Sequence, residues 1–99
     1  MEIRQLKTFK AVADYRSFHK AAEAIHYAQS TVSAQIIGLE ADLGVRLFER
    51  LGRKIVLTEV GESLYQYACK MIELSEAART ELAEKTHLAG SLTIRRTLY

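Results

Sequence analysis

The feature that most constrains this chain is one long helical segment, predicted over residues 59–88. No proline interrupts it, and the whole 99-residue chain contains none. Thr58 can cap this segment, and Glu59 and Glu62 follow in the first turn, where the helix dipole favours acidic side chains. At a rise of 1.5 Å per residue the helix would be roughly 45 Å long. A helix of that length cannot bury itself against the small head that the preceding residues can form.

The predicted helix carries a broad face of apolar and small side chains. One stripe alternates steps of four and three residues, and a neighbouring stripe repeats every seven, which favours a partner helix packed along it. We therefore expect homodimerisation through this helix, because no partner is evident within the chain. The alternative is a single helix that lies on a domain outside this sequence. The predicted interface residues are Leu64, Ala68, Met71, Ser75, Ala78 and Leu82 in the first stripe and Val60, Tyr67 and Leu74 in the second.

Residues 1–58 predict a mainly α-helical head of three helices followed by a β-hairpin. Apolar residues at spacings of three and four indicate helices over residues 3–14, 18–25 and 29–43. Ser17 can cap the second helix, and Gly44 suits the left-handed position after the third. Two short β-type segments then flank LGRK, residues 51–54, which is typical of a hairpin tip. This order of elements predicts a winged helix-turn-helix followed by a long dimerising helix.

Charge and cysteine content narrow the functional class. Residues 1–58 hold nine Lys or Arg and six Asp or Glu, whereas residues 59–90 hold three and six. A basic head before an acidic rod permits nucleic-acid binding without requiring it. The single Cys69 excludes an internal disulfide framework, and the three dispersed histidines indicate no metal site. No nucleophile lies beside a base, so we do not expect an enzyme.

The N-terminal sequence gives an expectation about location. MEIRQLK lacks the apolar core of a signal peptide, and no apolar run is long enough to span a bilayer. We therefore expect a cytoplasmic protein with no membrane partner.

The stretch AQSTVSAQI, residues 28–36, begins the third predicted helix and contains no Arg or Lys. In a winged helix-turn-helix, the second helix of the pair enters the major groove with its N-terminal residues facing the bases. The hairpin tip can reach the minor groove or the phosphates. Uncharged polar residues at this place either face water or read base edges.

Residues 17–50, SFHKAAEAIHYAQSTVSAQIIGLEADLGVRLFER, resemble the DNA-binding signature of LysR-type bacterial transcriptional regulators. Residues 52–61, GRKIVLTEVG, are similar to that family's wing and the start of its linker helix. The resemblance extends to about residue 94, where GSLTI would open the family's effector-binding domain. It implies a DNA-binding domain at 1–58, a linker helix at 59–88, and the start of a truncated effector domain or a tail at 89–99.

The resemblance also implies partners. The family's regulators bind double-stranded DNA at an interrupted inverted repeat as homodimers, and a tetramer is implied for the full-length protein. No cofactor is expected within this chain. A small-molecule co-inducer is implied for the C-terminal domain that lies outside it.

Individual residues take their expected roles from the same resemblance. The positions of Gln29, Ser30 and Thr31 open the family's recognition helix, and Ser33 matches a residue that touches bases or phosphates. Glutamine can pair bidentately with adenine N6 and N7, which gives Gln29 a physical reason to read a base. Arg50 has an ion pair with Glu49 or with an acidic residue of a helix as its alternative. The residues expected at the DNA backbone or in the minor groove are His19, Lys20, Gln35, Arg50, Arg53 and Lys54.

Three positions depart from the family's usual pattern. The family has Ser where Ala28 stands, Pro where Ser30 stands, and Arg where Ala34 stands. A missing cap at 28 costs about 0.5–2 kcal/mol in other helices, unless Ser30 caps a helix that begins slightly later. The low charge of this helix and the acidic rod keep a second hypothesis open. The chain would then be an oligomerisation or protein-interaction module with only non-specific DNA affinity.

Overall fold

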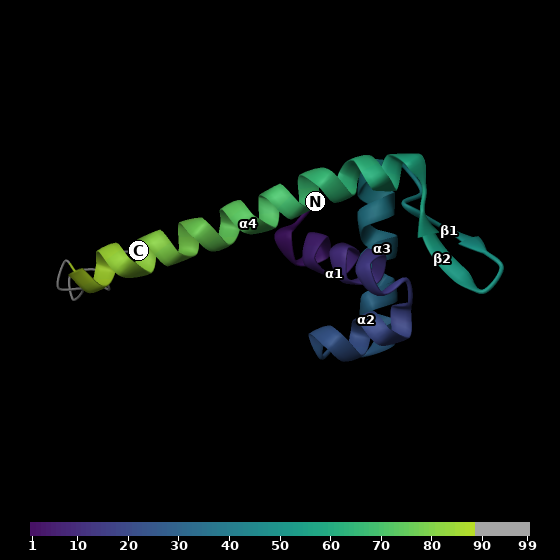
Figure 1. Ribbon diagram of the computed structural model, residues 1–99, viewed down its shortest axis with the longest axis horizontal. Helices are drawn as coiled ribbons and strands as arrows, with labels where there is room; N and C mark the ends of the chain where they lie inside the picture. Colours follow the sequence, from purple (N-terminus) through teal and green to yellow (C-terminus); the bar gives the residue numbers. More distant parts are fainter. Residues whose placement is uncertain (89–99) are drawn as a thin grey trace.

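A computed structural model describes residues 1–88 of the protein. The chain forms a helical head, a two-stranded wing and one long helix that extends away from the head (Figure 1). The predicted winged helix-turn-helix is confirmed, and the strand expected at 91–94 lies outside the described residues. The elements in chain order are α1 (Ile3–Tyr15), α2 (Phe18–Ile25), α3 (Gln29–Leu43), β1 (Phe48–Leu51), β2 (Lys54–Leu57) and α4 (Glu59–Leu88).

The ends of the short helices follow from local chemistry. Ser17 Oγ accepts a hydrogen bond from the Lys20 N–H at 3.1 Å and caps α2 as predicted. Gly44 follows α3 with a φ of 70°, in the left-handed region that glycine adopts without steric cost. Arg16 and His26 end α1 and α2 in the same region, with φ values of 54° and 61°. These sharp ends let α1, α2 and α3 follow one another with almost no loop between them.

The core of the head is built around one aromatic side chain of the wing. The Phe48 ring lies 5.4 Å from the Phe9 ring and 6.2 Å from the Phe18 ring, measured between centroids. α1, α2 and β1 therefore meet at Phe48. The inner face of α3 completes this core and leaves the other face of that helix outside. The α3 residues buried in the core are Val32, Ile36 and Leu39.

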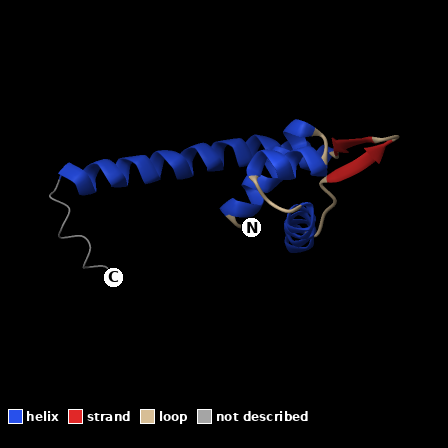
Figure 2. Cartoon of the chain, turned by 90° about the horizontal axis from the view of Figure 1, so that it is seen from below, coloured by secondary structure: helices blue, strands red, loops and turns tan. Residues whose placement is uncertain are grey.

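The wing is an antiparallel hairpin with a two-residue loop. Leu51 pairs with Lys54 at its end, so only Gly52 and Arg53 connect the strands. Gly52 has a φ of 64°, and glycine with positive φ at the first loop position is the pattern of a type II′ turn. The hairpin points away from the helices, on the side opposite to the free end of α4 (Figure 2). Arg53 therefore lies at the outermost point of the wing.

The first half of α4 packs against α1, so the expectation that this helix has no partner within the chain was wrong. Ala68 is fully buried there and leaves no surface for a second protomer. Leu64 and Met71 are half-buried against the same core. Lys7 on α1 forms an ion pair with Glu76 on α4, with 3.0 Å between Nζ and Oε2. Periodicity could not distinguish these residues from a partner-facing stripe, because either neighbour would cover an apolar face.

A polar contact also joins α1 to α4. The Tyr65 hydroxyl donates to Asp14 Oδ1, and Lys10 Nζ lies 2.7 Å from Asp14 Oδ2. Burial raises the pKa of the Asp14 carboxyl, but the hydrogen bonds from Lys10 and Tyr65 outweigh it and hold that pKa below its usual range. The hydrogen bond to Asp14 in turn raises the pKa of the Tyr65 hydroxyl. Together with the ion pair to Glu76, this contact links α1 of the head to α4.

Beyond Glu76, α4 is free of the head as far as Lys85. Every side chain from Ala77 to Lys85 is exposed, and the helix projects outward as a rod (Figure 1). Within residues 1–88, no helix is both long enough and apolar enough to cross a membrane.

Gly61 lies in the first turn of α4, where the wing joins the long helix. Thr58 Oγ1 accepts the Gly61 N–H at 3.0 Å and caps α4 as predicted. The Thr58 N–H donates to the Leu47 carbonyl at 2.9 Å. A Cβ placed on Gly61 would lie 2.3 Å from that carbonyl oxygen. The glycine therefore allows the two backbones to approach closely at this junction.

Gly61→Ala is expected to lower the free energy of unfolding by about 1–3 kcal/mol, the usual cost of overpacking, although alanine is the better helix former. Gly38→Ala is the matched control in the interior of α3, because its Cβ would meet only Gln5 Nε2, at 3.4 Å. That variant should gain up to about 1 kcal/mol. Urea unfolding measures both changes, and equal stabilisation by the two would contradict the close approach.

Candidate nucleic-acid interface

The opening turns of α3 present uncharged polar side chains on the outside of the head. Gln29, Ser30 and Thr31 are exposed, and Ser33 is half-buried. These are the four residues predicted to contact bases, and they gather around the exposed start of one helix. Their donors and acceptors are suited to base edges, which present both in the major groove.

The start of α3 has no side-chain cap. Ala28 occupies the capping position with extended backbone angles, a φ of −70° and a ψ of 148°. Its carbonyl accepts the N–H groups of Thr31 and Val32 at 3.0 and 3.2 Å. The helix therefore begins at Gln29, and the alternative start with Ser30 as the cap is wrong. An uncapped helix start favours an anion such as a phosphate, because its N–H groups and dipole point outward.

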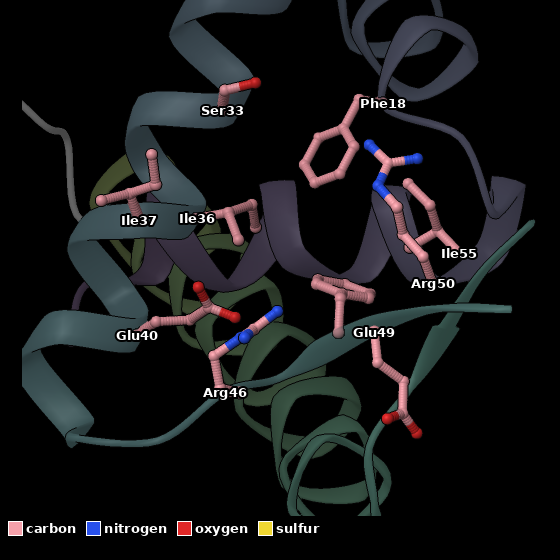
Figure 3. A pocket seen from close by; sticks show the side chains of 10 residues that line it. Phe18, Ser33, Ile36, Ile37, Glu40, Arg46, Glu49, Arg50 and Ile55 are labelled. Atoms are coloured by element: carbon pink, nitrogen blue, oxygen red, sulfur yellow. The ribbon is translucent and has the colours of Figure 1, made fainter.

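A groove of about 200 Å³ lies between α3 and the wing (Figure 3). Ser33 and Ile37 line it from α3, and Arg46 and Arg50 line it from the wing side. α3 and the cations Arg46 and Arg50 therefore border one concave surface. Its other lining residues are the apolar Phe18, Ile36, Phe48 and Ile55 and the acidic Glu40 and Glu49.

The positive charge of the wing is available to a ligand. Arg50, Arg53 and Lys54 are all exposed. In the described part of the chain none of the three forms an ion pair, and the alternative pairing of Arg50 with Glu49 is not made. All three cations can therefore face phosphates, and Arg53 extends farthest from the head.

The cations of the other elements divide into paired and unpaired groups. Lys7 and Lys10 on α1 are held by acidic partners. On α2, His19 lies 3.3 Å from Glu23, a contact that is an ion pair only when the imidazole is protonated. Lys20 is exposed and forms no ion pair with any residue that the structure describes. Within the described head, the cations without an ion pair are thus Lys20 on α2, the three of the wing, and Arg16 and Arg46 in the segments before α2 and β1.

The acidic residues of α3 lie in its second half and are engaged there. Glu40 Oε2 accepts the Leu47 N–H at 2.8 Å, and Asp42 Oδ2 lies 2.6 Å from the Met1 amino group. α3 contains no Lys or Arg. The opening turns of this helix therefore meet a ligand without charge of either sign.

Gln35 differs from the other predicted contacts because it already has a partner within the protein. Its side-chain oxygen accepts a hydrogen bond from the Thr8 hydroxyl, and Thr8 is the buried polar residue of α1. Gln35 therefore has only its amide N–H groups to offer a phosphate. The contact holds α3 against α1, a role that helical spacing alone did not indicate.

Two further residues belong to this surface and were not predicted. Arg46 lines the groove beside Arg50, and it precedes the first strand, so no strand periodicity assigned it to a face. Ile37 is 65% exposed on α3, although it directly follows the buried Ile36. Among the described residues, no group of three His, Cys, Asp or Glu side chains comes together as a metal site.

Comparison with known proteins identifies the family. Residues 3–62 match the model described as bacterial regulatory helix-turn-helix protein, lysR family. The chain belongs to the LysR family. It is 42% identical over 94 residues to the uncharacterised HTH-type transcriptional regulator YwqM of Bacillus subtilis, a match that covers 95% of the chain and 32% of YwqM. It is 49% identical over 78 residues to the HTH-type transcriptional regulator BudR of Klebsiella aerogenes, covering 79% of the chain and 54% of BudR.

This LysR-family chain thus spans about a third of the length of YwqM, and its match covers about half of BudR. Solved structures agree with the sequence matches. The BenM_DBD complex with catB site 1 DNA superposes with a TM-score of 0.79 at 37% identity and covers 88% of this chain and 96% of that one. The CbnR_DBD–DNA complex has a TM-score of 0.75 at 41% identity, and the match covers 85% of this chain and 99% of that one.

Ala28→Ser is expected to raise the free energy of unfolding by about 0.5–2 kcal/mol, because serine at this extended position can accept the Ser30 N–H, whereas the Thr31 N–H already donates to the carbonyl of residue 28. Ser17→Ala is the matched control, since it removes the same kind of cap from α2 and should lower stability by a similar amount. Urea unfolding measures both. If Ala28→Ser leaves the free energy of unfolding unchanged while Ser17→Ala lowers it, the backbone N–H groups at the start of α3 already have hydrogen-bond partners.

Proposed function

We propose that this chain is the DNA-binding part of a bacterial LysR-type transcriptional regulator that recognises double-stranded DNA by sequence. The observation that carries the proposal is the exposed, uncharged opening of α3 beside unpaired wing cations. The similar BenM and CbnR domains were solved with DNA, which supports it. The protein would act in the cytoplasm, where bacterial DNA lies, and would catalyse no reaction.

The start of α3 would enter the major groove and supply the sequence preference. Gln29 would pair with adenine through its amide, and Ser30, Thr31 and Ser33 would bond to neighbouring base edges. All four lie within two turns of one another, so they would face adjacent base pairs of one half-site.

Affinity would come mainly from phosphates. Arg50, Arg53 and Lys54 would hold the backbone or enter the minor groove beside the major-groove contact, because the wing lies next to α3 (Figure 1). His19 and Lys20 would hold a phosphate from the start of α2. Binding should therefore weaken steeply as salt rises, since each neutralised phosphate releases counterions.

We also propose that the exposed apolar stripe of α4 joins two protomers. Val60, Tyr67, Leu74 and Leu82 are 46%, 63%, 71% and 64% exposed, and they lie about two turns apart along one broad side of α4. Ser75 and Ala78 flank this stripe, whereas Leu64 and Met71 can contribute only the part that the head leaves uncovered. A dimer would bring two heads to the half-sites of an interrupted inverted repeat.

The intact protein would have partners that this chain does not show. The match covers only 28–29% of full-length BenM and CbnR. We propose that a C-terminal domain binds a small-molecule co-inducer and supports a tetramer, as the family resemblance implies.

Gln29→Ala is expected to weaken binding to the best duplex selected from a random pool by about five- to 150-fold, the range for losing one bidentate base contact. Affinity for a duplex of unrelated sequence should hardly change, because Gln29 neutralises no phosphate. Fluorescence anisotropy on both duplexes measures the ratio, with Gln66→Ala on the exposed side of α4 as the control. Equal losses on the two duplexes would reject base reading by Gln29.

Leu82→Asp is expected to weaken dimerisation at least tenfold, because it places a charge in the proposed apolar contact. Thr80→Asp is the matched control, since Thr80 is exposed on nearly the opposite side of the same free segment. Sedimentation equilibrium of both variants gives the dissociation constants. A dimer of unchanged affinity in Leu82→Asp would move the interface elsewhere.

The acidic rod favours the second hypothesis, an interaction module with only non-specific DNA affinity. Selection of bound duplexes from a random pool distinguishes this hypothesis from sequence-specific recognition. An interaction module would enrich no sequence, whereas a recognition domain would enrich a repeat with dyad symmetry.

A further inference from the structure

An apolar patch occupies the outer face of the proposed recognition helix. Ile37 is 65% exposed and Ala34 is exposed one turn before it. With Ser30 they lie at positions i, i+4 and i+7, so they share one side of α3. Figure 3 shows the Ile37 side chain directed away from the core residue Ile36. No segment that the structure describes covers this patch.

The position of the patch favours DNA as its occupant. The proposed dimer stripe lies on α4 and does not continue onto α3. Ile37 instead continues the surface that begins at Gln29, and the rise between these two residues is about 12 Å. The major groove admits an α-helix, and that length corresponds to three to four base-pair steps of 3.4 Å. A helix laid along the groove would therefore carry Ala34 and Ile37 in with its opening turns.

The chemistry of the patch selects one feature of the bases. Ala34 and Ile37 carry no side-chain donor or acceptor, and the thymine C5-methyl group is the apolar feature that base edges present in the major groove. α3 also has no Arg or Lys to pair with guanine O6 and N7. Its polar residue best suited to bidentate contact is Gln29, whose natural partner is adenine.

We propose that Ile37, together with Ala34, is a specificity-determining contact that recognises thymine methyl groups in the major groove. The inference rests on the proposed function and narrows it. The preferred half-site contains A·T pairs under α3, where glutamine bonds to adenine and the aliphatic patch packs against thymine. Preference for these pairs comes partly from buried methyl groups and not only from hydrogen bonds.

The test removes the methyl group and keeps every hydrogen-bonding edge. Each thymine of a duplex selected from a random pool is replaced singly by deoxyuridine, and affinities are measured by anisotropy. At one or two positions, deoxyuridine should lower the affinity of the wild-type protein about three- to fivefold, which is the effect of burying one methyl group. Ile37→Ala should bind the thymine duplex more weakly and show no difference between thymine and deoxyuridine there.

Two variants serve as controls. Ile37→Val keeps a branched aliphatic side chain and should retain most of the preference for thymine. Leu51→Ala removes a side chain of nearly equal exposure, 64%, from the wing and should leave the preference at those positions intact. Ile37 lies outside the core, so its variants are expected to fold, and circular dichroism confirms the helix content.

Each outcome of the experiment is decisive. If the protein binds its selected duplex specifically and no deoxyuridine substitution changes the affinity, the inference is wrong and the proposed function stands. A thymine preference that persists unchanged in Ile37→Ala assigns the methyl contact to another residue and also overturns it. Failure to enrich any sequence from the pool rejects the proposed function itself.

Discussion

The backbone of Leu47 holds the three working parts of this protein together. Its N–H donates to Glu40 at the end of α3, and its carbonyl accepts the Thr58 N–H at the start of α4. Its side chain is fully buried between them. The wing begins at the next residue, Phe48, whose ring contacts α1 and α2. One residue therefore connects α3, the wing and α4, and Gly61 leaves the room that this junction needs.

Positive charge and uncharged groups suited to base contacts lie on separate elements of the head. The cations of α1 are paired with acidic residues, and those of α3 are absent, whereas the wing and the start of α2 keep theirs unpaired within the described residues. The helix that would enter the groove is left with polar and apolar groups. This arrangement separates attraction to phosphates, which is indifferent to sequence, from base contacts, which are not.

The sequence predicted the local structure well because local signals determine it. Ser17, Gly44 and Thr58 mark helix ends through their own hydrogen bonds or φ values, and helical spacing identifies α1, α2 and α3. Contacts between distant elements were not predictable in this way. The stripe on α4 could not reveal that Ala68 faces α1, and nothing near Gln35 pointed to Thr8. The exposure of Ile37 emerged only with the packing of α3, while the roles of the base-facing residues stay predictions.

The contacts between α1 and α4 affect the distance between the two heads of the proposed dimer. Because the first half of α4 packs against α1 around the buried Ala68, the gap between two heads depends on where their rods cross. A shift by one seven-residue repeat moves a contact by about 10 Å along the helix. That distance corresponds to roughly three base-pair steps of 3.4 Å. The register of Val60, Tyr67 and Leu74 would thus set the number of base pairs between the half-sites. None of these three residues would itself touch DNA.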